Sequence, residues 1–388
     1  MEARPCVYAA RPERTVYNHP IPESTGDGDM QSDDTRAAFE ASLFDVLRTG
    51  LRITRANPRL TARAVRLVWR QRQAAVRREQ ADDRGVHVPP FVIYSVTGRC
   101  NLQCAGCYAN LLHRHDRPEL TPEETARWLD EAQGLGVSVI LLAGGEPLLR
   151  ADLFEQIERR PGILFLLFSN GALLHDARIR RLRRLPQVVP VLSLEGGEAE
   201  TDGRRGGGTY EHVTTAMDRL GKMGVFFGTS ATLTRRNFDQ ATDEAYLRSL
   251  IRRGCRLFYF INYVPVEPGT DDLQLDDSQV AELGHRLTRF RRSLGALFIA
   301  FPHDEMEFGG CLAAGKGFLH VNAYGDVEPC PFSPYADSSL KTMSFEQALA
   351  SPLFRTIRAS DALDEADGRC ALWKKREWVK GLVGKDGP

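Results

Sequence analysis

The chain has no excess of either charge, since its 51 Lys and Arg residues balance its 51 Asp and Glu residues. Net charge therefore gives no reason to expect a nucleic-acid partner. No apolar run reaches the about 18 residues that a membrane-spanning helix needs, and no repeat of solenoid period is visible. The 42% hydrophobic and 26% charged residues are typical of a globular protein of one large domain, or of a large and a small one.

Cysteine is scarce, with eight residues among 388. The opening residues MEARPCVYAARPER have no apolar core of the kind that a secretory signal needs. We therefore expect a reducing, cytoplasmic protein, and a chain of this length does not need disulfides for stability. Six of the cysteines fall into two groups, and clustered spacing fits metal binding better than disulfide pairing.

The N-terminal part of the chain is polar and then strongly basic. Residues 1–35 are rich in Pro, Gly, Asp and Ser and are expected to form a flexible leader. Residues 36–85 are expected to form two helices, with Asn57-Pro58 at the start of the second. Ten arginines and no acidic residue lie between Arg48 and Arg78. This stretch is either a solvated basic face packed on the main domain or a docking surface for a membrane, nucleic acid or acidic partner.

Residues 86–296 alternate between strand-like and helical patterns. The apolar strand-like runs cover residues 91–96, 137–142, 163–168, 188–194, 225–233 and 257–264. The helical stretches cover residues 121–135, 151–159, 176–185, 209–223 and 239–253. This alternation predicts an α/β fold, a partial (β/α)6 TIM-like barrel whose parallel strands are covered by helices. In such barrels the chemistry takes place at the C-terminal ends of the strands.

Residues 297–388 follow a different pattern and are expected to form a small C-terminal domain. They are rich in Gly, Pro and turn-forming pairs. Tyr324-Gly325-Asp326 predicts a hairpin turn between residues 318–322 and 327–329. A helix is expected near residues 344–357.

The most informative motif is Cys100-x3-Cys104-x2-Cys107, which directly follows the first expected strand. Three thiolates can bind three irons of a cubane iron–sulfur cluster and leave the fourth iron open to a small molecule. A zinc site or three structural cysteines are the alternatives. The polar residues of the loop, which include Arg, Asn, Gln and Gly, make apolar burial a poor explanation.

A second motif, Gly144-Gly145-Glu146-Pro147, follows the second expected strand. Together the two motifs resemble those of the radical S-adenosylmethionine (radical SAM) superfamily. The resemblance implies a 4Fe-4S cluster on the three cysteines, with S-adenosylmethionine held on its open iron. It also implies reductive cleavage of the cofactor to a 5′-deoxyadenosyl radical. That radical would take a hydrogen atom from a substrate C–H bond, with epimerisation, oxidation or bond formation as the result.

The resemblance assigns further residues to the bound cofactor. Glu146, with Gly144, Gly145 and Pro147, would receive the amino group of S-adenosylmethionine, although an ordinary strand-to-helix turn would also explain these four residues. Polar residues at later strand ends would contact its ribose and methionine parts, namely Asn170, Ser193 and Glu195, although turn-forming residues are common there.

Two further cofactor contacts depend on residues near glycine-rich or cysteine loops. Arg205, beside a glycine-rich loop, would bind the methionine carboxylate, with a solvated arginine as the alternative. Family members often carry an aromatic residue just before the third cysteine, against the adenine. Gly106 takes that position here, so the contact is expected from Tyr108 or from backbone alone.

The second cysteine group consists of Cys311, Cys330 and Cys370. With the hairpin between its first two members, it resembles the C-terminal domain called twitch or SPASM, which binds auxiliary iron–sulfur clusters. The resemblance implies one such cluster, of 4Fe-4S type. The cysteine that often follows the last one is missing from Cys370-Ala371-Leu372-Trp373. Either one iron is open towards substrate or a residue other than cysteine completes the site; a zinc site and unligated cysteines are alternatives.

Cys255 stands alone at the start of the sixth expected strand. It is either a small buried hydrophobic residue or a hydrogen-atom donor to a substrate radical, as an epimerase would need. Tyr263 and Glu267, near the other end of that strand, are candidates for lining a substrate pocket. No function is assigned to Cys6.

The resemblance leaves the substrate and the electron donor open. Members with this type of C-terminal domain act on peptides, sugars and other small molecules. The N-terminal part shows no clear peptide-leader-binding domain, so a natural-product-type small molecule is favoured over a ribosomal peptide. A flavodoxin- or ferredoxin-type protein is expected to supply the electron. A non-catalytic iron–sulfur electron carrier and a zinc-bearing binding protein are the readings from other classes.

Overall fold

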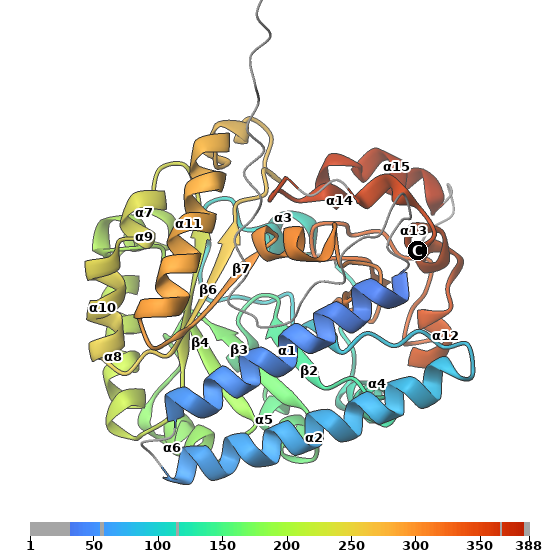
Figure 1. Cartoon of the computed structure of the whole chain (residues 1–388), viewed down its shortest axis with the longest axis horizontal. Coiled ribbons are helices and arrows are strands. Elements are labelled where there is room, and N and C mark those ends of the chain that lie inside the picture. The colour runs from blue at the N-terminus through green and yellow to red at the C-terminus, as the bar shows by residue number, and fades with distance from the viewer. Residues whose placement is uncertain (1–31, 55–57, 114–115, 365–366, 384–388) are drawn as a thin grey trace, which may run out of the picture.

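The computed structural model describes residues 32–54, 58–113, 116–364 and 367–383. Its centre is a nine-stranded sheet in the order β7-β6-β5-β4-β3-β2-β1-β8-β9 (Figure 1). The strands are β1 (Phe91–Ser95), β2 (Val139–Ala143), β3 (Leu164–Ser169), β4 (Val188–Ser193), β5 (Gly228–Leu233), β6 (Leu257–Asn262), β7 (Leu297–Phe301), β8 (Phe318–Val321) and β9 (Val327–Glu328). Almost all of the expected leader, with Cys6, lies outside the described residues.

The partial barrel expected from the sequence is confirmed, and the sheet extends beyond it on both sides. All six expected strands form, and each pairs in parallel with the next. A strand that the sequence pattern did not reveal, β7, adds in parallel beside β6. At the other side β8 pairs in parallel with β1, and β9 pairs antiparallel with β8. The segment from residue 297 onward therefore contributes strands to both sides of the barrel.

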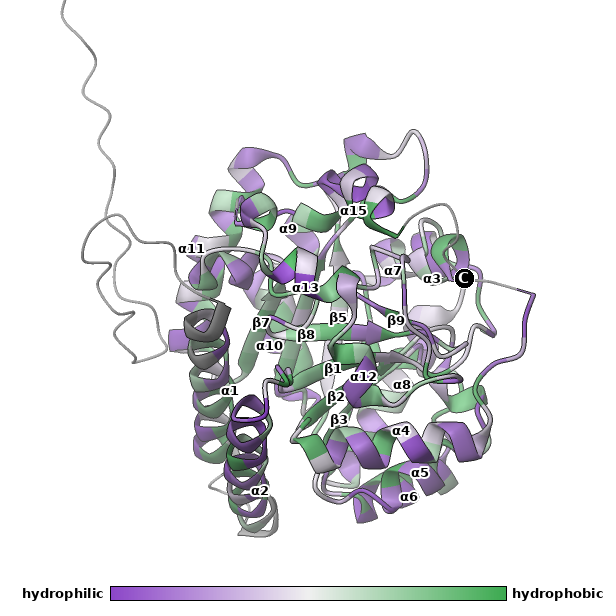
Figure 2. Cartoon of the chain, turned by 90° about the vertical axis from the view of Figure 1, so that its right-hand side faces the viewer, coloured by the Kyte–Doolittle hydropathy of each residue, from purple (hydrophilic) through white to green (hydrophobic). Residues whose placement is uncertain are grey.

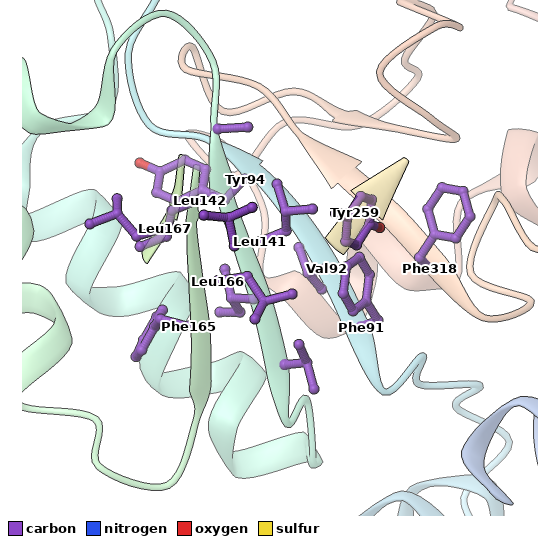
Figure 3. Close-up of a cluster of buried hydrophobic side chains, with 14 of the residues drawn as sticks. Phe91, Val92, Tyr94, Leu141, Leu142, Phe165, Leu166, Leu167, Tyr259 and Phe318 are labelled. Atoms are coloured by element: carbon purple, nitrogen blue, oxygen red, sulfur yellow. The ribbon is translucent and has the colours of Figure 1, made fainter. Parts of the chain in front are cut away.

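The strands are apolar because they are covered on both faces. All five residues of β2, with the sequence VILLA, are buried. Figure 3 shows the side chains of β1, β2 and β3 in one cluster with Tyr259 of β6 and Phe318 of β8. The rings of Phe91 and Phe318 meet edge to face, with their centroids 6.4 Å apart. This core fixes the strand ends from which the functional loops extend.

Helices cover the outer face of the sheet (Figure 1). They are α4 (Pro122–Leu135), α5 (Leu153–Glu158), α6 (Asp176–Arg184), α7 (Glu198–Arg205), α8 (Thr209–Lys222), α9 (Phe238–Ala241), α10 (Glu244–Arg252) and α11 (Asp277–Ser293). Local signals set their ends: Thr121 and Glu124 form a capping box at the start of α4, and Gly136 ends it at a φ of 105°. The expected helix 239–253 is divided into α9 and α10, because Asp243 caps α10 by accepting from the Tyr246 amide.

The basic N-terminal extension forms α1 (Ser32–Thr54) and α2 (Pro58–Asp82). The two helices pack together through ion pairs, one of them between Arg78 Nε and Glu40 Oε1 at 2.7 Å. Figure 2 shows them stacked along one side of the barrel, and Gln71 reaches the carbonyl of Ser138, just before β2. The pair therefore covers the N-terminal ends of strands. No helix among the described residues is both long and apolar enough to cross a membrane.

One face of α2 stays exposed. Val65, Trp69 and Val76 are 54%, 59% and 50% exposed, and exposed arginines lie beside them. This arrangement is compatible with both readings of the basic stretch, so surface docking by these helices stays a prediction. The face lies at the opposite ends of the strands from the cysteine loop that follows β1.

The C-terminal region wraps around the top of the sheet with short elements. They are η3 (His303–Phe308), the hairpin β8–β9, α12 (Phe345–Leu349), α13 (Pro352–Arg358), η4 (Asp361–Leu363), α14 (Ala371–Lys374) and α15 (Arg376–Leu382). Three further short helices lie earlier in the chain: α3 (Tyr108–Leu112), η1 (Pro147–Leu149) and η2 (Asp271–Leu273). The expected hairpin is confirmed, with His320 opposite Glu328. The expected helix 344–357 is two helices, because Ser351 caps a new helix with Pro352 at its first position.

Candidate active site

The first cysteine loop lies at the C-terminal end of β1, as the sequence predicts. Cys100 is exposed, whereas Cys104 and Cys107 are partly buried. The loop is fixed at its start by Glu119, whose Oε1 accepts from the Gly98 amide and the Thr97 hydroxyl, both at 2.8 Å. It is fixed near its end by a bond from the Ala105 amide to the carbonyl of Arg204. The backbone is therefore held on both sides of the three thiols.

The Gly-Gly-Glu-Pro segment packs directly against this loop. The Gly145 amide donates to the Thr97 carbonyl at 2.8 Å, and the Glu146 amide donates to the Arg99 carbonyl at 2.9 Å. A Cβ on Gly145 would lie 2.0 Å from the Arg99 oxygen, and one on Gly144, whose φ is 106°, would lie 2.5 Å from the Thr97 oxygen. The two glycines thus let the backbones of the two motifs pack closely together. Both also line the cavity, and their expected part in binding the cofactor stays a prediction.

Glu146 is buried after the end of β2 and joins it to the end of β3. Its Oε1 accepts from the Ser169 hydroxyl at 3.0 Å and from the Leu148 amide at 3.1 Å, and its Oε2 accepts from the Asn170 amide at 2.9 Å. Burial raises the pKa of this carboxyl group, and the three hydrogen bonds oppose that rise. The side chain also lines a cavity beside the first cysteines. Its expected contact with an amino group stays a prediction.

Asn170 connects the third strand to the cysteine loop. Its Nδ2 donates to Oδ1 of Asn101, the residue after Cys100, at 2.8 Å. Its Oδ1 accepts from the Ala172 amide. The side chain lines the same cavity as Glu146 and the cysteines. Asn170 therefore orients the loop, whatever it binds in addition.

Glu195 anchors two arginines, an arrangement that the sequence did not reveal. It is fully buried, and its Oε1 accepts from Arg204 Nη1 at 2.6 Å and from Arg205 Nε at 2.7 Å. Its Oε2 accepts from the Thr232 amide at 2.8 Å. Burial alone would raise the pKa of Glu195, but the charges of Arg204 and Arg205 outweigh it and hold that pKa below its usual range.

The two arginines, rather than Glu195, reach the cavity wall, together with Ser193. Glu195 therefore anchors the two arginines, and its expected contact with the cofactor stays a prediction. Burial raises the pKa of the Cys104 thiol, and the charges of Arg205 and Arg204 act against that rise. Two cations held by one anion leave a net positive charge beside the first cysteine loop, which suits both thiolates and a carboxylate ligand.

Tyr108 and Tyr263 lie on different sides of the first cysteine loop. The Tyr108 ring lies 5.1 Å from the Phe332 ring and 6.0 Å from that of His113, and so contacts the segment around the second cysteine group. Gly106, at a φ of 61°, packs against Tyr263, whose Oη would lie 2.8 Å from a Cβ at that position. Both tyrosines line the cavity. The aromatic ring beside the third cysteine thus comes from the end of β6.

The second cysteine group comes from three separate segments. Cys311 follows η3, Cys330 follows β9 and Cys370 precedes α14. Cys311 and Cys330 are 7% and 6% exposed, and burial raises the pKa of both thiols well above the usual value. Burial raises the pKa of Cys370 to about 12. The structure therefore collects the three thiols that the sequence placed together only by resemblance.

Both cysteine groups line a single cavity of about 230 Å³. Its polar wall includes Glu146, Asn170, Ser193, Arg204, Arg205 and Glu305. Among the described residues, neither trio has its three sulfur atoms all within 4.8 Å of one another. Tetrahedral zinc would place thiolates about 4 Å apart, so neither trio forms a ready-made zinc site. Two groups of three thiols thus face one cavity.

A buried polar network joins the two cysteine groups. The ligand atoms of His113, His320 and Glu328 lie within 4.8 Å of one another. The ring nitrogens of His320 bond to Ser95 Oγ at 2.8 Å and to Glu328 Oε2 at 2.6 Å, while His113 Nε2 bonds to the Pro331 carbonyl. Burial lowers the pKa of His320 to about 3, so the ring is neutral. These atoms already have partners, and the network braces the end of β1 against the C-terminal hairpin.

Cys255 does not line this cavity. It is fully buried before the first residue of β6, and its sulfur contacts the Leu257 carbonyl at 3.3 Å. Burial raises the pKa of its thiol to about 11. The described residues that line the cavity do not include it. This placement supports the reading of a small buried hydrophobic residue and argues against a hydrogen-atom donor.

Sequence reasoning missed several residues that hold the cysteine loop in place or line the cavity. Asn101, Glu119 and Arg204 hold the cysteine loop, and Glu305 lines the cavity beside the second group. Asn101 and Arg204 are neighbours of residues that were predicted, so their positions in the chain offered a signal. Glu305 lies in a segment without periodic pattern, and only the packing of η3 reveals its position.

Known proteins share the sequence features of this chain. A model of the radical SAM superfamily matches residues 94–246. The chain is 30% identical over 299 residues to the mycofactocin maturase MftC of Mycobacterium tuberculosis, covering 71% of this chain and 74% of the relative. It is 24% identical over 324 residues to an AdoMet-dependent heme synthase of Methanosarcina barkeri, covering 76% of this chain and 91% of the relative.

Solved structures share the fold. The crystal structure of Streptococcus suis SuiB bound to S-adenosylmethionine superimposes with a TM-score of 0.61 at 19% identity, covering 77% of this chain and 72% of SuiB. The structure of anSMEcpe with bound AdoMet superimposes with a TM-score of 0.56 at 17% identity, covering 77% of this chain and 88% of that one. The family match, the MftC similarity and the cysteine loop beside its Gly-Gly-Glu-Pro segment agree: the chain belongs to the radical SAM superfamily and is a radical SAM enzyme.

Proposed function

We propose that this radical SAM enzyme activates a C–H bond of a small, largely apolar substrate held between its two cysteine groups. The observation that carries the proposal is the shared cavity. Its walls are mostly aromatic and aliphatic, and include Phe91, Phe168, Tyr259, Phe301 and Phe318. Apolar walls exclude water, which would otherwise quench or divert a reactive intermediate.

The chain's own residues suit the cofactor that the family uses. Cys100, Cys104 and Cys107 would hold the first 4Fe-4S cluster. With S-adenosylmethionine bound, that cluster supplies the 5′-deoxyadenosyl radical. Glu146 offers buried carboxylate oxygens for an amino group, and Arg204 and Arg205 offer positive charge for a carboxylate.

The remaining contacts fall to the strand ends around the cofactor. We assign Ser193 and Asn170 to polar contacts, because both line the cavity between these charged groups. We assign the adenine contact to Tyr263 rather than to Tyr108, since Tyr263 packs against Gly106 beside the third cysteine.

We assign an auxiliary 4Fe-4S cluster to Cys311, Cys330 and Cys370. Because all three thiols line the cavity, such a cluster would lie next to the substrate space and could exchange an electron with a substrate-derived species. The external electron donor would approach the exposed side of the Cys100 loop. The arginines of α2 lie at the opposite ends of the strands and do not suit that role.

A ribosomal peptide is the second candidate substrate. The similarity to the mycofactocin maturase MftC, at 30% identity, favours it. Relatives named as heme, pre-heme d1 and Fe-coproporphyrin III synthases favour a small molecule of the tetrapyrrole class instead. The apolar walls of the cavity suit a flat apolar ring better than the polar backbone of an extended peptide, so we place the small molecule first.

The test is stimulation of cofactor cleavage. Anaerobically reconstituted protein is given dithionite and S-adenosylmethionine, with iron-coproporphyrin III, a synthetic peptide or neither, and 5′-deoxyadenosine is measured by chromatography. The proposal expects cleavage that a tetrapyrrole increases, together with a shift of its absorption on binding. Stimulation by peptide alone would transfer the assignment to peptide maturation. Iron uptake without any 5′-deoxyadenosine would contradict the C–H activation proposed here.

A further inference from the structure

The auxiliary cluster proposed above lacks a fourth cysteine. Cys311, Cys330 and Cys370 supply three thiolates, and the residues after Cys370 are Ala371, Leu372 and Trp373. A cubane cluster has four irons, and each needs a ligand from the protein or from another molecule. What completes the site decides whether substrate can bind to the cluster.

Glu305 is placed to complete it. The residue lies in η3, is 6% exposed and lines the same cavity as the three cysteines. Its Oε1 accepts from the Leu312 amide at 3.2 Å, which ties the carboxylate to the residue after Cys311. A second bond, from the Gly310 amide to the Glu305 carbonyl, closes the same turn. Backbone contacts on either side of Cys311 therefore hold this carboxylate beside the cysteine.

Glu305 differs from the acidic residues near it in its ion pairs. Its neighbours Asp304 and Glu307 both pair with Arg291, at 2.8 and 3.6 Å. Among the residues that the structure describes, no basic side chain forms an ion pair with Glu305 itself. Burial disfavours the charged form of a carboxylate that has no cation beside it. A metal cluster at this point would supply the missing positive charge.

The same carboxylate lines one cavity with all three thiols. Glu305 and Cys311 come from one segment, and Cys330 and Cys370 come from two others. Three thiols and one carboxylate thus face the same space. Such a set suits an iron–sulfur cluster, whose irons accept anionic ligands.

We propose that Glu305 is the fourth protein ligand of the auxiliary cluster, through a carboxylate oxygen. This inference rests on the auxiliary cluster proposed for Cys311, Cys330 and Cys370. A cluster closed in this way has no iron open to substrate, so it exchanges electrons with the substrate space rather than binding the substrate. It also explains why the chain tolerates the loss of the fourth cysteine.

The experiment isolates the auxiliary cluster in the full chain. A background protein with Cys100, Cys104 and Cys107 all replaced by Ala is reconstituted with ⁵⁷Fe, and its iron content, Mössbauer spectrum and EPR spectrum are recorded. We expect about four irons per chain, with one iron distinguished by oxygen ligation. A background protein without iron would contradict the auxiliary cluster itself and not the position of Glu305.

Substitutions at Glu305 then test the ligand. Glu305→Ala should lose about one iron in four and show the EPR signal of a three-iron cluster after oxidation. Glu305→Cys should restore four irons and remove the distinct iron site, which shows that the Ala variant did not simply misfold. Glu307→Gln, a neighbouring carboxylate in η3, is the matched control and should match the background. A Glu305→Ala protein with unchanged iron content and Mössbauer spectrum would overturn the proposal.

Discussion

The two cysteine groups line one cavity, yet the chain builds them in opposite ways. The first trio lies in a single loop, is partly exposed and stands beside the cations of Arg204 and Arg205. The second trio comes from three distant segments, is more deeply buried and stands beside the carboxylate of Glu305. Positive surroundings raise the reduction potential of an iron–sulfur cluster, and negative or buried surroundings lower it.

The difference predicts which cysteine group meets which partner. An exposed loop can receive an electron from a protein that docks at the surface, whereas the buried group lies beside whatever the cavity holds. The network of His113, His320 and Glu328 bridges the two loops with neutral or hydrogen-bonded groups. The following predictions test this division of labour, in order of their expected effect on 5′-deoxyadenosine formation.

The largest effect is expected at the first group. Replacement of Cys100, Cys104 and Cys107 by Ala removes the thiolates that hold the first cluster, so 5′-deoxyadenosine should fall to background. The measurement is chromatography of an anaerobic reaction with dithionite and S-adenosylmethionine. Cys255→Ala is the control, because that buried thiol contacts neither group and should leave cofactor cleavage intact. Full activity in the triple variant would remove the basis of the comparison.

Gly145→Ala should have the next largest effect. Its new Cβ would lie 2.0 Å from the Arg99 carbonyl oxygen, so the cysteine loop or the Gly-Gly-Glu-Pro segment must move. Backbone cannot yield as a flexible side chain does, and we expect cleavage to fall at least about tenfold with a stability loss of about 1–3 kcal/mol. Gly134→Ala in α4 is the control, since nothing lies within 4 Å of that position. Equal behaviour of the two variants would show that the motifs are not locked together.

Glu195→Gln should weaken cofactor binding more than turnover. The change leaves two arginines without their shared anion, and we expect a severalfold higher KM for S-adenosylmethionine and a stability loss of about 3 kcal/mol. Glu198→Gln, an exposed residue of α7, is the control and should stay within about 0.5 kcal/mol. The measurements are kinetics of 5′-deoxyadenosine formation and thermal unfolding of both variants.

The pH dependence of Glu195 gives an independent test. Burial opposes ionisation of Glu195, but the positive charges of the two arginines outweigh it. They hold the pKa of Glu195 in the folded protein below the unfolded value of about 4.3. The stabilisation is therefore complete above that unfolded value and is lost as the pH falls through the folded pKa. Wild-type protein should lose melting temperature below about pH 4 more steeply than Glu195→Gln. Parallel curves for the two proteins would show that Glu195 does not stay ionised in the fold.

Sequence reasoning identified the features set by residues close together in the chain. It missed the contacts formed where distant segments meet in space. The six strands of the barrel follow from apolar runs between turn signals, and the Cys100 loop follows from spacing within a few residues. β7 escaped because its five residues lie inside a stretch that otherwise reads as turns. The ion pairs of Glu195 and the position of Glu305 depend on which loops meet in space. A single sequence does not carry that information, because contacts between distant segments are set by the packing of the whole core.

The smallest effect on cofactor cleavage is expected at the second group, and it is the sharpest test of the comparison. Cys311→Ala removes a buried thiol from the auxiliary group but leaves the loop of Cys100 and its contacts with Arg204 unchanged. Formation of 5′-deoxyadenosine should therefore stay within a fewfold range of wild type, while conversion of any substrate that stimulates cleavage is lost. Thermal unfolding and the retained iron of the first cluster show that the variant is folded. If Cys311→Ala instead abolished cleavage as completely as the triple variant does, the two groups would act as one unit, and the division between an electron-receiving loop and a substrate-facing cluster would not hold.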